Sequence, residues 1–196
     1  PLKNILEACE AGGHPNRAYY FFSTSKITFP GAGISLIASG PDNMKEFKGH
    51  MSSQTIGHDK LNQLRHVQYF KTPENIRAHM AALAEVLRPK FDMVLNRLEE
   101  ELEGSGLAVW SRPKGGYFIS LDTLAGCAKR TVQLAKEAGV TLTGAGATYP
   151  YKRDPQDRNI RIAPTYPTPE ELKSAMDIFI LCVKIAGIES VVNQGN

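Results

Sequence analysis

The sequence predicts an α/β or α+β fold in which short strands alternate with helices. Two apolar runs, "AYYFFSTS" at 18–25 and "ISLIASG" at 34–40, have the composition of buried strands. An apolar residue at every third or fourth position from Ile76 to Leu102 predicts one long amphipathic helix. Near the end of the chain, the strand-like stretch "NIRIA" is followed by the helix start "TPEEL".

Composition favours a small-molecule function. The chain has 196 residues, 42% of them hydrophobic, and a net charge of 23 − 20 = +3 without a basic block, so neither nucleic acid nor a membrane surface is expected as a partner. No apolar run is long enough to span a membrane and no signal peptide opens the sequence. Cys9, Cys127 and Cys182 lie far apart, which predicts reduced thiols and a cytoplasmic location. The histidine and cysteine spacings predict no metal site.

The first half of the chain continues with helices. The polar segment 41–70 predicts a short helix, an "SSQTIG" loop and a second helix. Thr72 is an expected N-cap, with Pro73 at the first helical position. The long helix that starts there should bend at Pro89 and end before Gly104.

The second half begins with two predicted strands, "LAVWS" and "GYFISL", joined by an "RPKG" turn. A helix is expected from about Thr123 to Gly139. Thr168 and Glu171 form a predicted capping box that opens a last helix, which should run to about Ala186.

Lys26 stands at the exit of the first predicted strand, where burial is expected. Because an ammonium group is costly to bury, such a lysine reaches water, pairs with a carboxylate, or acts as an amine nucleophile toward a carbonyl. Composition alone favours the first two roles. Ser23 and Ser25 add hydroxyls beside it, while Gly31 and Gly33 permit the close backbone approach that a nearby phosphate would need.

Arg161 is the second candidate. The alternation in "NIRIAP" directs Ile160 and Ile162 to one face and Arg161 to the other, away from the core. A guanidinium group there could bind a carboxylate through two parallel hydrogen bonds. The alternative is a surface ion pair with Asp154 or Asp157.

Five stretches together carry a family resemblance: "STSKITFPGAG", "GHDKLNQLRH", "GGYFISLD", "GVTLTGAGATYPY" and "DPQDRNIRIAP". They resemble the fold-type I pyridoxal-phosphate enzymes, in the aspartate aminotransferase-like branch close to the aminotransferase domain of MocR-type regulators. The resemblance covers the whole chain in the right order. It implies the end of a large mixed-sheet domain followed by an α+β small domain.

The resemblance also implies residue roles. Lys26 would hold pyridoxal 5'-phosphate through a Schiff base and move the substrate proton. Ser23 and Ser25 would bind the cofactor phosphate, and Arg161 the substrate carboxylate. The sequence departs from the commoner pattern of the superfamily, in which an arginine follows the lysine by seven or eight residues, because Gly33 and Ile34 stand there.

Family members are about twice as long, so the chain is expected to be the C-terminal half of an aminotransferase. Residues 1–72 would close the cofactor-binding domain, and residues 73–196 would form the long helix and the small domain. The reaction implied is transfer of an amino group from an amino acid, aspartate in this branch, to a 2-oxo acid, 2-oxoglutarate. The isolated fragment is expected to be inactive.

Two other functions stay open. The chain could be the effector domain of a MocR-like transcription regulator, or a β-lyase. The family's homodimers imply that Ser53, Gln54 and Thr55 reach a second active site, although a plain polar turn explains them equally well. His66 on the following helix is expected to be structural, as a lone histidine on a helix usually is.

Overall fold

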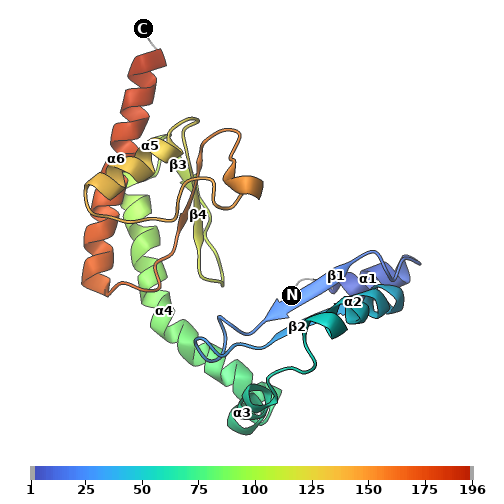
Figure 1. The fold of residues 1–196 in the computed structure, drawn as a ribbon. Coiled ribbons are helices and arrows are strands. Elements are labelled where there is room, and N and C mark those ends of the chain that lie inside the picture. Colours follow the sequence, from blue (N-terminus) through green and yellow to red (C-terminus); the bar gives the residue numbers. More distant parts are fainter. Residues whose placement is uncertain (1–2, 195–196) are drawn as a thin grey trace. The chain divides into compact units, whose positions relative to one another are not determined.

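The computed structural model describes residues 3–194 and divides the chain into two compact units, 1–83 and 84–196 (Figure 1). The first unit contains α1 (Ile5–Ala11), β1 (Tyr19–Ser23), β2 (Ser35–Ser39), α2 (Pro41–Gln54), α3 (Lys60–Phe70) and the start of α4 (Pro73–Leu102). The second contains the rest of α4, β3 (Ala108–Trp110), β4 (Ile119–Thr123), α5 (Ala128–Glu137), a short 3₁₀ turn (Pro150–Lys152), β5 (Asn159–Ile162) and α6 (Pro169–Gln194). This mixture of strands and helices confirms the predicted α/β class.

The two strands predicted near the start of the chain do form, but the expectation that they are buried is wrong. They pair antiparallel, from Tyr19 opposite Ser39 to Ser23 opposite Ser35. All five residues of β1 are exposed, and Phe21 is 70% exposed. In the described part of the chain no further strand pairs with this ribbon, and two strands alone have no second layer to bury their side chains.

The helices of the first unit follow the sequence with two corrections. The α1 helix (Ile5–Ala11) was not predicted. The expected "SSQTIG" loop is shorter, because α2 continues to Gln54. The α3 helix begins with the amide of Asn62 donating to Asp59 Oδ1 at 2.9 Å. The α4 helix begins at Pro73 as predicted, with the amide of Asn75 donating to Thr72 Oγ1 at 3.4 Å, and the helix continues through Pro89.

The core of the second unit lies between a sheet and three helices. The sheet has the antiparallel order β3-β4-β5, with Leu121 opposite both Trp110 and Ile160. Alternate residues of β4 and β5 point to one face, which α4, α5 and α6 cover (Figure 1). The largest fully buried side chains include Phe179, Leu98, Leu102, Ile119, Leu121, Ile160 and Val94.

The α5 helix begins later than predicted, at Ala128 instead of near Thr123. Thr123 is the last residue of β4, and its hydroxyl donates to the carbonyls of Leu124 at 3.0 Å and Arg158 at 3.2 Å. Gly126, with φ of +79°, then turns the chain into the helix.

The capping box of α6 is confirmed. The amide of Thr168 donates to Glu171 Oε2 at 2.9 Å, and the amide of Glu171 donates to Thr168 Oγ1 at 3.2 Å. The helix then continues past the predicted end at Ala186, to Gln194.

Charged hydrogen bonds join α6 to the other helices of the second unit. Arg97 on α4 donates to Asp177 Oδ1 through Nη2 at 2.6 Å, and Arg130 on α5 donates to Glu189 through Nε at 2.7 Å and Nη2 at 2.8 Å. The hydrogen bond from Arg97 lowers the pKa of Asp177, and the hydrogen bond from Arg130 lowers the pKa of Glu189.

These lowered pKa values predict an acid-sensitive stability. A carboxylate whose pKa is lower in the folded than in the unfolded chain stabilises the fold above its unfolded pKa, about 4, and this contribution is lost as pH falls through the folded pKa. Urea unfolding followed by the fluorescence of Trp110, the only tryptophan, should therefore give a midpoint that declines in acid. Asp177→Asn should flatten this decline, whereas Asp92→Asn, at an exposed position of α4, should leave it unchanged. Equal slopes for the two variants would contradict the assignment.

Candidate active site

Lys26 lies in a tight turn that follows β1. The carbonyl of Thr24 accepts hydrogen bonds from the amides of Ile27 at 2.8 Å and Thr28 at 3.0 Å, so a single helical turn carries the lysine. Lys26 is exposed, which corrects the expectation of burial. All five residues of the preceding strand β1 are exposed as well, so Lys26 does not stand at the exit of a buried strand.

Ser23 and Ser25 place two hydroxyl groups beside this lysine. Their Oγ atoms lie 2.7 Å apart, and the amide of Ser25 donates to Ser23 Oγ at 3.2 Å. Both serines are exposed. Two exposed hydroxyls and one exposed primary amine therefore lie within four consecutive residues, and Thr24 between them is half-buried.

Gly33 permits a close approach, and the group that approaches is Ser25. A Cβ atom at Gly33 would lie 2.7 Å from Ser25 Oγ and 2.9 Å from Ser25 Cα. Gly31 has nothing within 4 Å of its Cβ position, and its φ of +73° is one that glycine adopts easily. Gly33 thus lets the strand that follows the loop pack against the serine turn.

Arg161 lies in β5 on the face that the sequence predicts. Ile160 and Ile162 are 0% and 3% exposed in the core, whereas Arg161 is half-buried on the opposite face. Its guanidinium carbon lies 4.3 Å from the centre of the Phe118 ring, and its Nη2 donates to Thr143 Oγ1 at 3.2 Å. Arg161 Nε is buried and has no hydrogen-bond partner among the residues described.

The alternative ion pair of Arg161 is not found between residues 3 and 194. Asp154 instead accepts hydrogen bonds from the amides of Arg158 at 2.7 Å and Asn159 at 2.8 Å. Burial raises the pKa of Asp154, but these amide hydrogen bonds outweigh burial and the net pKa is lowered. Asp157 lies 3.9 Å from the ammonium group of Lys129. The two acids therefore order the loop that leads into β5.

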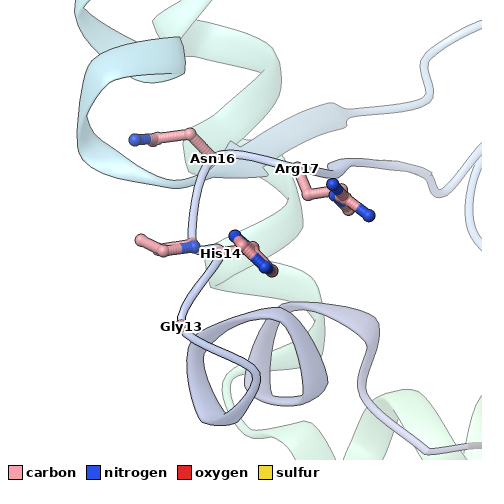
Figure 2. A pocket seen from close by; sticks show the side chains of 5 residues that line it. Gly13, His14, Asn16 and Arg17 are labelled. Carbon is pink, nitrogen blue, oxygen red and sulfur yellow. The ribbon is translucent and has the colours of Figure 1, made fainter.

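The structure brings Ser23, Ser25 and Lys26 together in the first unit, while Arg161 belongs to the second. A separate surface hollow lies in the loop between α1 and β1, lined by Gly13, His14, Pro15, Asn16 and Arg17 (Figure 2). None of the predicted site residues lines this hollow.

The remaining features of the described residues concern membrane-spanning helices, metal ligands and cysteines. No described helix is long and apolar enough to cross a membrane, and within residues 3–194 no three histidine, cysteine or acidic side chains form a group that could hold a metal ion. Cys9, Cys127 and Cys182 are free thiols.

A family model described as "Aspartate amino-transferase" matches residues 1–195. The chain belongs to the aspartate aminotransferase family. An aspartate aminotransferase of Corynebacterium glutamicum is 48% identical over 190 residues, which are 97% of this chain and 44% of that protein. The chain therefore spans less than half the length of this relative.

Solved aminotransferase structures share the fold. The crystal structure of an aspartate transaminase from Corynebacterium glutamicum matches with a TM-score of 0.91 and 47% identity, covering 96% of this chain and 44% of that one. An α-aminoadipate aminotransferase of Thermus thermophilus, crystallised with N-(5'-phosphopyridoxyl)-L-leucine, matches with a TM-score of 0.74 at 19% identity, covering 94% of this chain and 46% of that one. This second likeness shows the fold alone.

Aminotransferases of this family depend on pyridoxal phosphate, and the residues present fit that cofactor. A primary amine bonds an aldehyde, and hydroxyl groups donate to phosphate oxygens. Lys26, Ser23 and Ser25 supply these groups at one exposed turn. No arginine stands at position 33 or 34, so the hydrogen-bond donors that this segment offers to a phosphate are hydroxyls and backbone amides.

Several residues around the site were not identified from the sequence. Phe118 lies against the guanidinium group of Arg161, and Thr143 accepts its hydrogen bond, although both belong to stretches that carry the family resemblance. Thr28 lies four residues after Thr24 and shares a hydrogen bond with His66. The four-residue spacing of the two threonines indicates a helical turn. No local pattern indicates that His66 in α3 is the partner of Thr28.

Proposed function

We propose that this chain is the C-terminal half of a pyridoxal-phosphate-dependent aminotransferase, which moves an amino group from aspartate to 2-oxoglutarate. The observation that carries the proposal is an exposed Ser-Thr-Ser-Lys turn in a chain that is 48% identical to an aspartate aminotransferase. Residues 1–72 would complete the cofactor-binding domain, and residues 73–196 would form the long helix and the small domain.

Lys26 performs two tasks in this proposal. Its amine would hold the cofactor through the aldehyde carbon and would be set free when an amino acid takes its place. The freed amine would then hold and move the α-proton of the amino acid. When bound, pyridoxal phosphate supplies the sink for the electron pair that the proton leaves behind.

The remaining residues bind and orient. Ser23 and Ser25 would bind the cofactor phosphate. One of the two hydroxyls donates to the other at 2.7 Å, so one hydroxyl hydrogen is free to donate to the phosphate while that bond is kept. Arg161 binds the α-carboxylate of the substrate, and its unpartnered Nε is a donor that such a ligand would satisfy. The ring of Phe118, whose centre lies 4.3 Å from the guanidinium carbon, supports the guanidinium group.

The exposed ribbon supports the view that more polypeptide belongs to the enzyme. Tyr19, Tyr20, Phe21 and Leu36 leave aromatic and aliphatic surface in contact with water, and such patches mark interaction sites. The covering polypeptide would be the remaining half of the enzyme. By analogy with the family we also propose a homodimer, to which Ser53, Gln54 and Thr55 would contribute.

The proposal is tested by comparing two proteins. The first is the isolated chain. The second, here termed the completed enzyme, is the chain joined to the part of the Corynebacterium glutamicum protein that lies outside the aligned 190 residues. The completed enzyme should form glutamate from aspartate and 2-oxoglutarate, and the isolated chain should form none.

Other outcomes separate the alternatives. Release of pyruvate and ammonia without glutamate would favour a β-lyase. Cofactor binding without any turnover would favour an effector domain. Transamination by the isolated chain would contradict the assignment of the chain as half of an enzyme.

A further inference from the structure

The turn that carries Lys26 is tied to α3 by hydrogen bonds that the proposed function does not use. Thr28 Oγ1 lies 2.9 Å from His66 Nε2, and His66 Nδ1 lies 2.9 Å from the carbonyl oxygen of Asn62. Asn62 Nδ2 in turn donates to the carbonyl of Ala32 at 2.9 Å. One helix therefore holds two points of the loop between β1 and β2.

The other end of the turn is fixed at Thr24. The amide of Thr24 donates to the carbonyl of Ile34 at 2.8 Å, and the amide of Ile34 donates to Thr24 Oγ1 at 2.8 Å. The hydroxyl of Thr28 lies 3.0 Å from Thr24 Oγ1. Thr24 stands between Ser23 and Ser25, so these hydrogen bonds fix the backbone from which the two serines and Lys26 project.

His66 is buried, whereas the two serines and the lysine on the turn that it contacts are exposed. His66 is 8% exposed, and its ring packs edge-on against Phe29 at 4.9 Å. Phe29 in turn stacks on Phe70 with ring centres 5.6 Å apart. A hydrogen bond in such surroundings is stronger than one in water, whereas Lys26 itself is exposed.

The hydrogen bonds of His66 assign its tautomer. A carbonyl oxygen can only accept, so Nδ1, which faces Asn62, carries the ring hydrogen. In the neutral ring Nε2 is then an acceptor, and the Thr28 hydroxyl shares its one hydrogen between Nε2 at 2.9 Å and Thr24 Oγ1 at 3.0 Å. Both ring nitrogens are thus occupied within the chain, so His66 is suited to a supporting role and not to contact with a substrate.

We propose that Thr28 and His66 are positioning residues for the Lys26 amine. They hold the turn so that the amine and the serine hydroxyls present themselves together to one molecule. This inference rests on the proposed function, because the molecule in question is the cofactor. It extends the site to two residues that touch neither cofactor nor substrate.

The test uses the completed enzyme and a pair of variants at each position. Thr28→Val keeps the shape of the side chain and removes the hydroxyl, while Thr28→Ser restores it. His66→Ala removes the acceptor, and His66→Gln returns a polar group near the position of Nε2. His50→Ala, at an exposed position of α2, is the matched control.

Two measurements report on the hydrogen bond between Thr28 and His66. The first is hydrogen exchange at the amide of Ile34, whose acceptor is Thr24 Oγ1. The second is the rate at which pyridoxal phosphate bonds Lys26, followed by absorbance and by peptide mass after borohydride reduction. Loss of one hydrogen bond corresponds to a change of roughly 3- to 10-fold.

Thr28→Val should speed the exchange and slow the bonding by this factor, with the KM for aspartate unchanged. Thr28→Ser and His66→Gln should keep most of the slow exchange at Ile34 and most of the rate of bonding at Lys26. His50→Ala should match the wild type in both measurements. Wild-type rates in Thr28→Val would overturn the inference. A wild-type completed enzyme that fails to bond pyridoxal phosphate at Lys26 would instead overturn the proposed function.

Discussion

Lys26→Ala in the completed enzyme is expected to lower the turnover number for amino transfer by roughly 10²- to 10⁴-fold, the contribution typical of a positioned general acid–base group. The amine is the one group of the 23–26 turn that can both bond the cofactor aldehyde and carry a proton between two carbon atoms. Lys26→Arg should be nearly as impaired, because a guanidinium group keeps the charge but does neither task at neutral pH.

The matched control for Lys26 is Lys48→Ala, since Lys48 is an exposed lysine of α2 in the same unit. This variant should keep wild-type turnover. Steady-state rates of glutamate formation decide the outcome, with circular dichroism to verify that all variants fold. A Lys26→Ala protein that keeps more than a tenth of the wild-type turnover would contradict the role of the lysine.

Arg161→Ala should lower kcat/KM for aspartate by roughly 10- to 100-fold, as expected for the loss of charge-assisted hydrogen bonds to a carboxylate. Arg161→Lys should recover only part of this, because an ammonium group lacks the planar fork that lies over Phe118. The rate at which pyridoxal phosphate bonds Lys26 should not change, because Arg161 is assigned to the substrate.

Arg153→Ala is the control for this second prediction, since Arg153 is an exposed arginine of the loop before β5. Kinetics with aspartate and with an amine that lacks the α-carboxylate separate the two roles. If Arg161→Ala and Arg153→Ala lose the same activity, or if the loss persists with the amine, Arg161 does not bind the carboxylate.

Local patterns predicted the parts of the fold that depend on neighbours in sequence. The capping box of Thr168 and Glu171 and the start of α4 after Thr72 were both correct, because each requires only side chains within one helical turn. The alternation around Arg161 was also correct, because a strand directs successive side chains to opposite faces.

The burial of β1 could not be predicted in this way. An apolar composition indicates that a strand is able to be buried, but burial itself depends on a second layer, and all five residues of β1 remain exposed in the two-stranded ribbon. The same reasoning applies to Lys26. Its position in the sequence identified it as a candidate, but its exposure could not be predicted from neighbouring residues. The start of α5 was misplaced because Thr123 remains in β4 through a hydrogen bond to Arg158, 35 residues away.

Contacts between distant residues also explain what was missed at the site. His66 was expected to be structural, but its hydrogen bond to Thr28 spans 38 residues, so no local pattern indicates which segment it supports. Phe118 under Arg161 was hidden for the same reason, since the two residues meet only when β4 and β5 pair.

The remaining assignments depend on the claim that the cofactor is covalently attached at Lys26. It is tested most directly by reducing the completed enzyme with borohydride in the presence of pyridoxal phosphate, digesting it, and locating the adduct by mass spectrometry. The adduct should lie on the peptide that contains Lys26 and be lost in Lys26→Ala. An adduct on another lysine, or none on any peptide, would contradict the account.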